Sequence, residues 1–459
     1  MRRFPNATLT LALAVFAVAS GLGAHPAHAQ RAAERETYEP VPMPPGFQVT
    51  NTELEGPVFA DAQGHTLYAW PRGGQRNGDA GEQKGRPTCD DTRYTVTSGL
   101  MSPYPAGLEL PELDTRPTCV QIWPPVLAAA DAKPVGKWTI VDRKDGAKQW
   151  AYDEYALYTS VLDEVPGDTR GGRKVSGRGG AGGDGGTPRV VVAPPSDVPA
   201  QFGVFSVRSG RLLALSTGFS VYAYDKDTPS KSGCTGACLR DWIPVLAGET
   251  AVSKGDWTVL EREPGVKQWV FRKKPLYTRL ADDTVRSLEG ADEPGWHNVY
   301  TQAWPAPPKE FTVHDSYAGQ VLADARGHAV YIYNCIDDAL DQQSCDHPGA
   351  PQAYRLAVCG GGDAARCLTT FPYVLAPKDA KSNNRTWTAV DIDPKTGRHA
   401  APGQADALHV WAYRGRPVFT YAGDKKPGQV GADGWGEFHG TRNGFKAFWL
   451  RDDFKGNAG

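Results

Sequence analysis

Beyond its first 29 residues the sequence has no apolar segment long enough to cross a bilayer as a helix. Its formal net charge is only -2, so there is no electrostatic reason to expect binding to nucleic acid or to an anionic membrane. It also lacks the H-E-x-x-H, G-x-S-x-G and C-x-x-C motifs of common metal, serine and dithiol centres. The chain therefore carries no motif for a membrane span, a nucleic-acid site or a familiar catalytic centre.

The N-terminus has the pattern of a secretory signal peptide over residues 1–29. Two arginines are followed by the apolar run Leu9–Ala19 and by an A-x-A cleavage site at Ala27-His28-Ala29. The first Cys of the chain is Cys89, so no Cys lies where a lipid anchor would need one. We therefore expect an exported protein, periplasmic or extracellular, without a lipid anchor.

One segment of the sequence occurs three times. In each copy an aromatic residue lies four positions after a Cys, and a Val-Leu-Ala triplet begins three positions after the aromatic residue. The Cys–aromatic pairs are Cys119 with Trp123, Cys238 with Trp242 and Cys367 with Phe371. A motif repeated at this fixed spacing indicates a tandem array of like units.

Two predicted β-hairpins flank each copy. The first consists of alternating apolar runs around a Gly-containing turn, at Gly56–Trp70, Gly210–Tyr224 and Gly319–Tyr333. The second runs between two tryptophans, at Trp138–Trp150, Trp257–Trp269 and, with an insertion, Trp387–Trp411. An Asp follows each second hairpin at a fixed distance, at Asp163, Asp282 and Asp424.

The pattern predicts an all-β fold of three tandem hairpin-rich modules, stacked or arranged like a propeller. The two hairpins of a module resemble each other, which suggests six half-modules in all. The predicted segments are a signal peptide (1–29), a Pro-rich leader (30–45), module one (46–166), a Gly-rich linker (167–189), module two (190–305) and module three (306–459). The leader and the linker are expected to be loose, because Pro-rich and Gly-rich stretches bury little apolar surface.

Module two carries the motif Tyr222-x-Tyr224-x-x-Asp227, followed by a Cys-Thr-Gly-Ala-Cys segment. These residues resemble a secreted-repeat family of predicted bacterial lipoproteins, whose signature is Y-x-[FWY]-x-x-D. Modules one and three depart from it, since the Asp is missing after Trp70 and comes one place late after Tyr333. The resemblance extends over nearly all of the mature chain. It implies a relationship at the level of the fold and no established biochemical role.

Internal copies help to separate structural residues from catalytic ones, because a residue needed for folding should recur in every copy. The recurrent aromatic residues are therefore expected to lie in the core. They are Tyr68, Tyr222, Tyr331, Trp150, Trp269 and Trp411, with Trp70, Tyr224 and Tyr333 two places after the tyrosines. The alternative is a surface that stacks on sugar or contacts haem.

All eight Cys lie in the predicted mature chain, and an even number in an exported protein indicates disulfides first. The candidate pairs are Cys234 with Cys238, Cys89 with Cys119, Cys335 with Cys345, and Cys359 with Cys367. The alternative for Cys234 and Cys238 is a thiol pair that binds copper or cycles its redox state. No His adjoins this pair, so the disulfide is favoured.

Several other polar residues are candidate ligands or acids. Asp163, Asp282 and Asp424 could serve as calcium ligands or acids, but a Pro-Gly step follows two of them closely, which favours turn capping. His399 and His409 lie in the module-three insertion and could meet a metal, although a solvated loop is the simpler interpretation.

The leading hypothesis is a non-enzymatic β-repeat protein that binds an envelope component or a small ligand, without a cofactor. The first alternative is a periplasmic protein that handles redox equivalents, copper or haem through Cys234 and Cys238. The second is a hydrolase whose active site lies in the module-three insertion.

Overall fold

The computed structural model describes residues 35–69, 89, 91, 119–171, 189–207, 209–317, 319–334, 368–382, 384–395, 399–433 and 444–451. Within these residues the chain forms short antiparallel strands in several small sheets, with very short helices. The all-β prediction is therefore confirmed. In the described part of the chain no sheet closes on itself and no propeller is formed. The predicted signal peptide lies outside the described residues.

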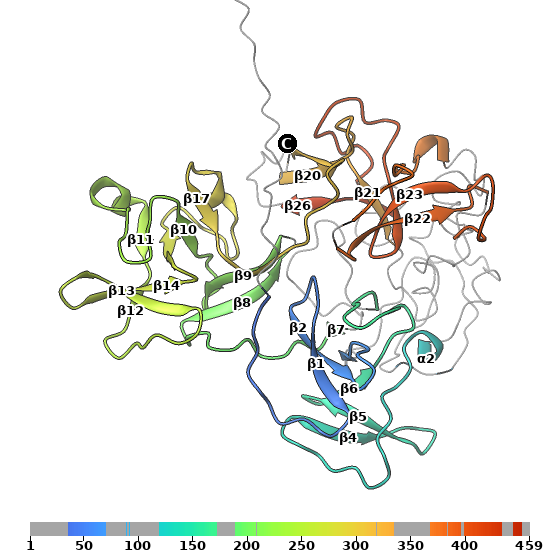
Figure 1. Cartoon of the computed structure of the whole chain (residues 1–459), viewed down its shortest axis with the longest axis horizontal. Coiled ribbons are helices and arrows are strands. Elements are labelled where there is room, and N and C mark those ends of the chain that lie inside the picture. Colours follow the sequence, from blue (N-terminus) through green and yellow to red (C-terminus); the bar gives the residue numbers. More distant parts are fainter. Residues whose placement is uncertain are drawn as a thin grey trace, which may run out of the picture.

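Module one is drawn in blue to teal in Figure 1. Its strands are β1 (Phe47–Asn51), β2 (Pro57–Asp61), β3 (Tyr68–Ala69), β4 (Trp138–Asp142), β5 (Lys148–Tyr152), β6 (Tyr155–Tyr158) and β7 (Arg189–Val190), with helix α2 (Cys119–Ile122) before β4. Strand β1 pairs with β2, and the others form a sheet in the order β4-β5-β6-β3-β7. Strand β7 pairs with β3, and Val192 bridges to Val58. These residues thus extend module one, whereas the predicted boundary assigned residues from 190 onward to module two.

Module two is drawn in green to yellow and contains three small sheets (Figure 1). The first is β18-β9-β8, the second β12-β14-β13 with β15 on β14, and the third β11-β16-β10-β17. The strands are β8 (Phe202–Val207), β9 (Gly210–Leu215), β10 (Tyr222–Tyr224), β11 (Trp242–Pro244), β12 (Leu246–Ala247), β13 (Trp257–Glu263), β14 (Val266–Phe271), β15 (Lys274–Pro275), β16 (Tyr277–Arg279), β17 (Trp296–Asn298) and β18 (Tyr300–Ala303). The 3-10 helices are η1 (Gly236–Arg240) and η2 (Glu289–Asp292).

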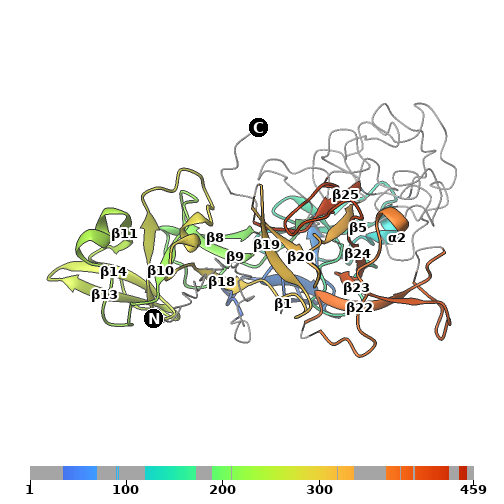
Figure 2. The same cartoon turned by 90° about the horizontal axis from the view of Figure 1, so that it is seen from above.

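Module three is drawn in orange to red and repeats the plan of module one. Its strands are β19 (Thr312–Ser316), β20 (Gly319–Ala323), β21 (Tyr331–Asn334), β22 (Trp387–Ile392), β23 (Leu408–Tyr413), β24 (Arg416–Phe419), β25 (Gly444–Ala447) and β26 (Trp449–Arg451). They form the sheets β19-β20-β26 and β22-β23-β24-β21-β25. Seen from above, module two extends to one side, whereas module three lies on the other (Figure 2).

The two halves of every module meet at one strand pair. The strand after the first turn lies antiparallel to the strand after the second turn, and equivalent aromatic residues face each other across them. These pairs are Tyr68 with Tyr158, Tyr222 with Tyr277 and Tyr331 with Phe419. This pairing of the two halves agrees with the similarity between the half-modules in the sequence.

The predicted second hairpins are present as β4–β5, β13–β14 and β22–β23. The predicted first hairpins form only at the turn, because the strands on its two sides then pair with other strands. In module one the Leu67 N–H donates to the Phe59 carbonyl across the turn, at 2.9 Å. Strand β2 then pairs with β1, whereas β3 pairs with β6 and β7. The chain therefore changes sheet after the turn, and this crossing joins the two sheets of the module.

Each module is centred on a cluster of four aromatic side chains. In module one the ring centroid of Phe47 lies 4.6 Å from that of Trp138 and 5.8 Å from that of Trp150, and Tyr152 completes the cluster. The equivalent clusters are Phe202, Trp257, Trp269 and Phe271 in module two, and Phe311, Trp387, Trp411 and Tyr413 in module three. All six tryptophans are buried, so these rings account for much of the apolar surface removed from water.

The described part of the leader, residues 35–45, is docked rather than loose. Glu36 is 3% exposed and forms a bidentate ion pair with Arg211 of module two, through Nε to Oε2 and Nη2 to Oε1, both at 3.0 Å. The Thr301 hydroxyl donates to the same carboxylate at 2.7 Å. A buried carboxylate with this many donors is stabilised in place. The sequence prediction was wrong here because one charged residue with a buried partner outweighs a Pro-rich composition.

The start of the predicted linker is also ordered. Asp168 and Thr169 are 8% and 5% exposed, and Asp168 accepts hydrogen bonds from the N–H groups of Glu164 and Val165. The described residues up to 171 therefore belong to a packed loop of module one. Residues 172–188, with the most Gly-rich part of the linker, lie outside the described residues.

Candidate functional site

Cys234 and Cys238 form a disulfide, with their Cα atoms 5.3 Å apart. Cys234 is fully buried, and η1 contains Cys238. The predicted disulfide is therefore present. Cys89 is also disulfide-bonded. The remaining cysteine side chains, those of Cys119, Cys335, Cys345, Cys359 and Cys367, lie outside the described part of the structure.

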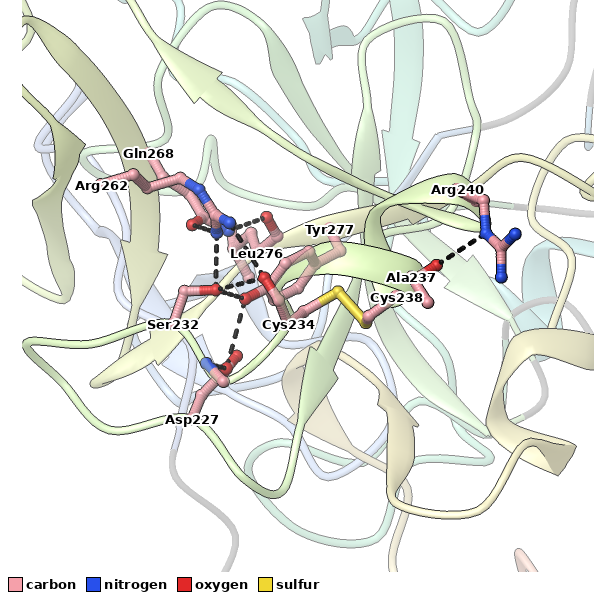
Figure 3. The surroundings of a disulfide bond; sticks show 11 residues. Asp227, Ser232, Cys234, Ala237, Cys238, Arg240, Arg262, Gln268, Leu276 and Tyr277 are labelled. Atoms are coloured by element: carbon pink, nitrogen blue, oxygen red, sulfur yellow. Dashed lines mark hydrogen bonds between the residues drawn. A yellow bond between two sulfur atoms is a disulfide. The ribbon is translucent and has the colours of Figure 1, made fainter.

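A polar network holds the loop that carries the disulfide (Figure 3). The Arg262 guanidinium donates to the Ser232 hydroxyl at 2.6 Å, to the Gln268 side-chain oxygen at 2.7 Å and to the Cys234 carbonyl at 2.9 Å. The Ser232 hydroxyl lies 2.5 Å from the Tyr277 hydroxyl. The loop before the disulfide is thus tied to β13, β14 and β16.

The motif acid Asp227 belongs to this network. Its Oδ1 accepts hydrogen bonds from the Gly233 N–H at 2.6 Å and from the Tyr277 hydroxyl at 3.2 Å. Asp227 is 9% exposed, and desolvation raises the pKa of its carboxyl above the usual value, although these hydrogen bonds oppose the shift. The last residue of the Y-x-Y-x-x-D motif therefore fixes the approach to the Cys pair.

The aromatic residue after the Cys lies in the core, as predicted. Trp242 is 6% exposed and stacks on Trp296, with ring centroids 3.6 Å apart and planes 5° from parallel. In module three Phe371 stacks on Phe445 with the same centroid distance. Trp123 of module one is 3% exposed. Modules two and three thus each bury this aromatic residue in a stacked pair.

The recurrent Tyr and Asp residues form one hydrogen bond in each module. The phenol of the middle strand donates to a carboxylate that lies far along the chain. The pairs are Tyr68 to Asp163 at 2.7 Å, Tyr222 to Asp282 at 2.7 Å and Tyr331 to Asp424 at 2.6 Å. The sequence showed both sets of residues but gave no sign that they meet.

The carboxylate also caps the loop that follows it, as the turn-capping interpretation predicted for two of the three acids. Oδ1 of Asp163 accepts the Arg170 N–H at 2.8 Å, and Oδ1 of Asp424 accepts the Gly431 N–H at 2.8 Å, each seven residues on. The loop then packs against the first hairpin turn, where a Cβ on the turn glycine would come within 3.0 Å of it. These contacts join Pro166 to Gly64, Val285 to Gly218 and Pro427 to Gly327.

Burial shifts the titration of these pairs. Desolvation raises the pKa of Asp163 to about 7, although the Tyr68 phenol and the loop N–H groups favour the ionised form. Desolvation likewise raises the pKa of Asp424. The phenols of Tyr68, Tyr222 and Tyr331 all have a pKa raised well above the usual value, by burial first and then by the adjoining carboxylate. The carboxyl of Asp163 is therefore partly protonated near neutral pH, but each pair points into its own loop.

One interior position differs between the modules. In module one the buried Gln149 donates to the Leu157 carbonyl at 2.7 Å and accepts from Arg143 at 2.8 Å. In module two Gln268 and Arg262 do the same. Module three has Val410 and Ile392 at these places, both fully buried. A polar pair has thus been exchanged for an apolar pair, with both members changed together.

The recurrent Val-Leu-Ala triplet presents its Leu to solvent in every module. Leu127, Leu246 and Leu375 are 58%, 54% and 64% exposed. Their neighbours Val126, Val245 and Val374 instead accept from the second Trp of the second hairpin and donate to a carbonyl in the segment that follows this hairpin. Single exposed apolar residues are common on soluble proteins, so these leucines do not by themselves mark a site.

The described residues contain no group of three or more His, Cys, Asp or Glu side chains placed to hold a metal ion. His409 pairs with Asp391 at 2.7 Å on an exposed part of β23, and His399 is exposed. Among the described helices none is long and apolar enough to cross a membrane. Of the motif aromatics, Trp70 and the side chain of Tyr333 lie outside the described part.

The comparisons with known proteins give one match. Residues 405–443 match the model of a family described as a secreted repeat of unknown function. The match lies in module three, although the sequence motif is clearest in module two. No curated protein and no solved structure matches the chain. The family resemblance is thus confirmed for one repeat, at residues 405–443.

Proposed function

We propose that this chain is an exported, non-enzymatic binding or structural protein of the cell envelope, in which three repeats form one scaffold. One observation carries the proposal: in every repeat the Tyr–Asp pair is enclosed by its own module. The phenol donates to the carboxylate, and in modules one and three the carboxylate also accepts a loop N–H. A general acid or base must instead reach the substrate.

The description of the matched family as secreted supports export. The periplasm or the outside of the cell is the location that we infer from the signal peptide pattern. The Cys234–Cys238 disulfide agrees with an oxidising compartment.

The experiment is native mass spectrometry of the mature protein purified from the envelope fraction of its host, with a parallel screen for turnover. We expect a bound non-covalent ligand or a co-purifying envelope component, and no turnover. A turnover that is lost in Tyr331→Phe, while the free energy of unfolding is unchanged, would contradict the proposal. Thiol counting on the same sample tests the redox alternative, because free thiols at Cys234 and Cys238 would favour it over a structural disulfide.

A further inference from the structure

A small cavity lies where modules one and three meet. It has a volume of about 130 Å³ and is lined by Arg35, Asn51, Glu53, Leu54, residues 166–170, Arg385, Thr386 and Arg414. Ligand pockets for drug-sized molecules have volumes of roughly 300–1,000 Å³. A cavity of this size therefore selects a ligand of only a few non-hydrogen atoms.

Arginines dominate the lining. Arg35, Arg170, Arg385 and Arg414 contribute four positive charges, against the two negative charges of Glu53 and Asp168. The cavity thus has an excess of two positive charges before any ligand enters. Guanidinium groups bind carboxylate and phosphate in a bidentate manner, because their planar N–H groups match two oxygens at once.

The two carboxylates of the cavity are already satisfied by module contacts. Glu53 accepts the N–H groups of Arg385 and Thr386 and the Thr386 hydroxyl, at 2.6–3.0 Å. Asp168 accepts from the Arg385 guanidinium at 2.6 Å. These carboxylates hold module three against module one. They therefore fix the positions of the arginines, and their two charges neutralise only part of the positive charge.

The arginines are fixed to different degrees. Arg385 also donates to the Pro166 carbonyl at 2.9 Å, Arg170 pairs with Glu164 at 2.7 Å, and Arg414 donates to the Thr169 carbonyl. The exposed Arg35 makes no side-chain hydrogen bond or ion pair with any residue that the structure describes. Its five N–H donors are available to a ligand.

One acceptor accompanies these donors. The Asn51 side-chain oxygen is buried at the cavity and receives no hydrogen bond from the described residues. A buried acceptor of this kind favours a ligand that brings a hydroxyl group as well as negative charge. Protonated phosphate and hydroxycarboxylates have both features, whereas a plain carboxylate has only the charge.

We propose that this junction binds a small oxyanion that carries a hydroxyl group, such as hydrogen phosphate or a hydroxycarboxylate. Arg35 and Arg385 hold the anionic oxygens, and Asn51 accepts the hydroxyl proton. This inference rests on the proposed function and names its ligand class. The site requires two modules at once, and Arg35, Arg385 and Asn51 have no equivalents in the other repeats.

The test is isothermal titration of the mature protein with inorganic phosphate, malate and succinate at pH 7 and low ionic strength. Phosphate and malate should bind, and malate should bind more tightly than succinate because only malate has the hydroxyl group. Arg35→Ala should weaken binding at least tenfold with an unchanged unfolding midpoint. Arg240→Ala, an exposed arginine of module two away from the cavity, is the matched control and should bind like wild type.

Absence of binding by all three anions would overturn the proposal, as would an Arg35→Ala variant that binds like wild type. Equal affinity for malate and succinate would show that Asn51 does not recognise the hydroxyl group of the ligand. Failure of the anion site is distinguishable from failure of the proposed function. In the first case native mass spectrometry still finds a ligand or partner, and in the second the parallel screen finds turnover.

Discussion

The interior of each repeat and the junction between modules one and three use different residues for different ends. Inside the repeats the Tyr–Asp bond and the aromatic cluster return three times with nearly the same distances, and the loop cap returns in modules one and three. At the junction Glu53, Asp168 and Arg385 have no counterparts in the other repeats. Recurrence therefore identifies what a repeat needs in order to fold. Contacts that occur once show how the repeats were joined, and where a new site could form.

The largest effect is expected inside a repeat. Trp242→Ala should lower the free energy of unfolding by about 3–5 kcal/mol, because it opens a cavity beside Trp296. Leu246→Ala, at an exposed recurrent position nearby, should change it by less than about 0.5 kcal/mol. Denaturant unfolding measures both. A stable Trp242→Ala variant that has lost ligand binding would show that this aromatic residue forms a site rather than core.

The contact between the leader and module two also occurs only once. It joins the segment before module one to module two. Glu36→Gln should cost about 3 kcal/mol, because Arg211 loses its buried counter-charge while the Gln oxygen can still accept from Thr301. Glu39→Gln, an exposed position three residues on, should have almost no effect. If the unfolding midpoints of the two variants are the same, the Glu36 contact does not stabilise the packing of the leader against module two.

The Tyr–Asp pair should make stability depend on pH. The pKa of Asp163 is about 7 in the folded chain, against an ordinary value of 3.8. Between these values the folded state binds one more proton than the unfolded state, so the free energy of unfolding falls as pH rises. The contribution is fully present below about pH 4 and is lost through pH 7, with a change on the order of 2 kcal/mol from pH 5 to pH 8.

Asp163→Asn removes this titration and should flatten the profile between pH 5 and pH 8. Asp131→Asn, an exposed carboxylate of the same module, should leave the profile as in wild type. Urea unfolding at four or five pH values decides the matter. A wild-type profile in Asp163→Asn would mean that this carboxyl titrates normally despite its burial.

The smallest predicted effect concerns the interior position at which module three replaces a polar pair by an apolar pair. Gln149→Val should destabilise module one by about 1–3 kcal/mol, because the Leu157 carbonyl and Arg143 lose their partner. Adding Arg143→Ile copies the natural pair of module three, and the two changes should be less than additive by about 1 kcal/mol. Strict additivity in the double-mutant cycle would show that the paired exchange in module three is coincidental.

Much of the repeat could be predicted from the sequence, because apolar alternation and fixed spacing report on local structure. The hairpin turns, the buried aromatics and the disulfide at Cys234 and Cys238 all followed from such patterns. Of each aromatic cluster, only the second Trp of the second hairpin was among the predicted core residues. Another member, Phe47, Phe202 or Phe311, precedes the first hairpin in every repeat and was a signal that could have been used.

Contacts between distant residues could not be predicted. The Tyr–Asp partners lie 60 to 95 residues apart. Spacing along the chain does not specify which of the recurrent positions meet in space. Glu36 and Asp168 lie in segments whose composition favours flexibility. Glu36 is held by one buried counter-charge, and Asp168 by two arginines and two backbone N–H groups. Such single charged residues give no periodic pattern in the sequence. The arginine cavity was missed because Arg35, Arg385 and Asn51 each occur in one repeat only and give no periodic pattern.

The most direct test measures unfolding midpoints with and without phosphate, at constant ionic strength, for wild type, Tyr331→Phe and Arg35→Gln. If recurrent residues hold the repeats and junction residues bind, Tyr331→Phe should lower the midpoint and keep the rise caused by phosphate. Arg35→Gln should keep the midpoint and lose that rise. A phosphate response that is lost with Tyr331→Phe at an unchanged midpoint, or retained in full with Arg35→Gln, would contradict this division of roles.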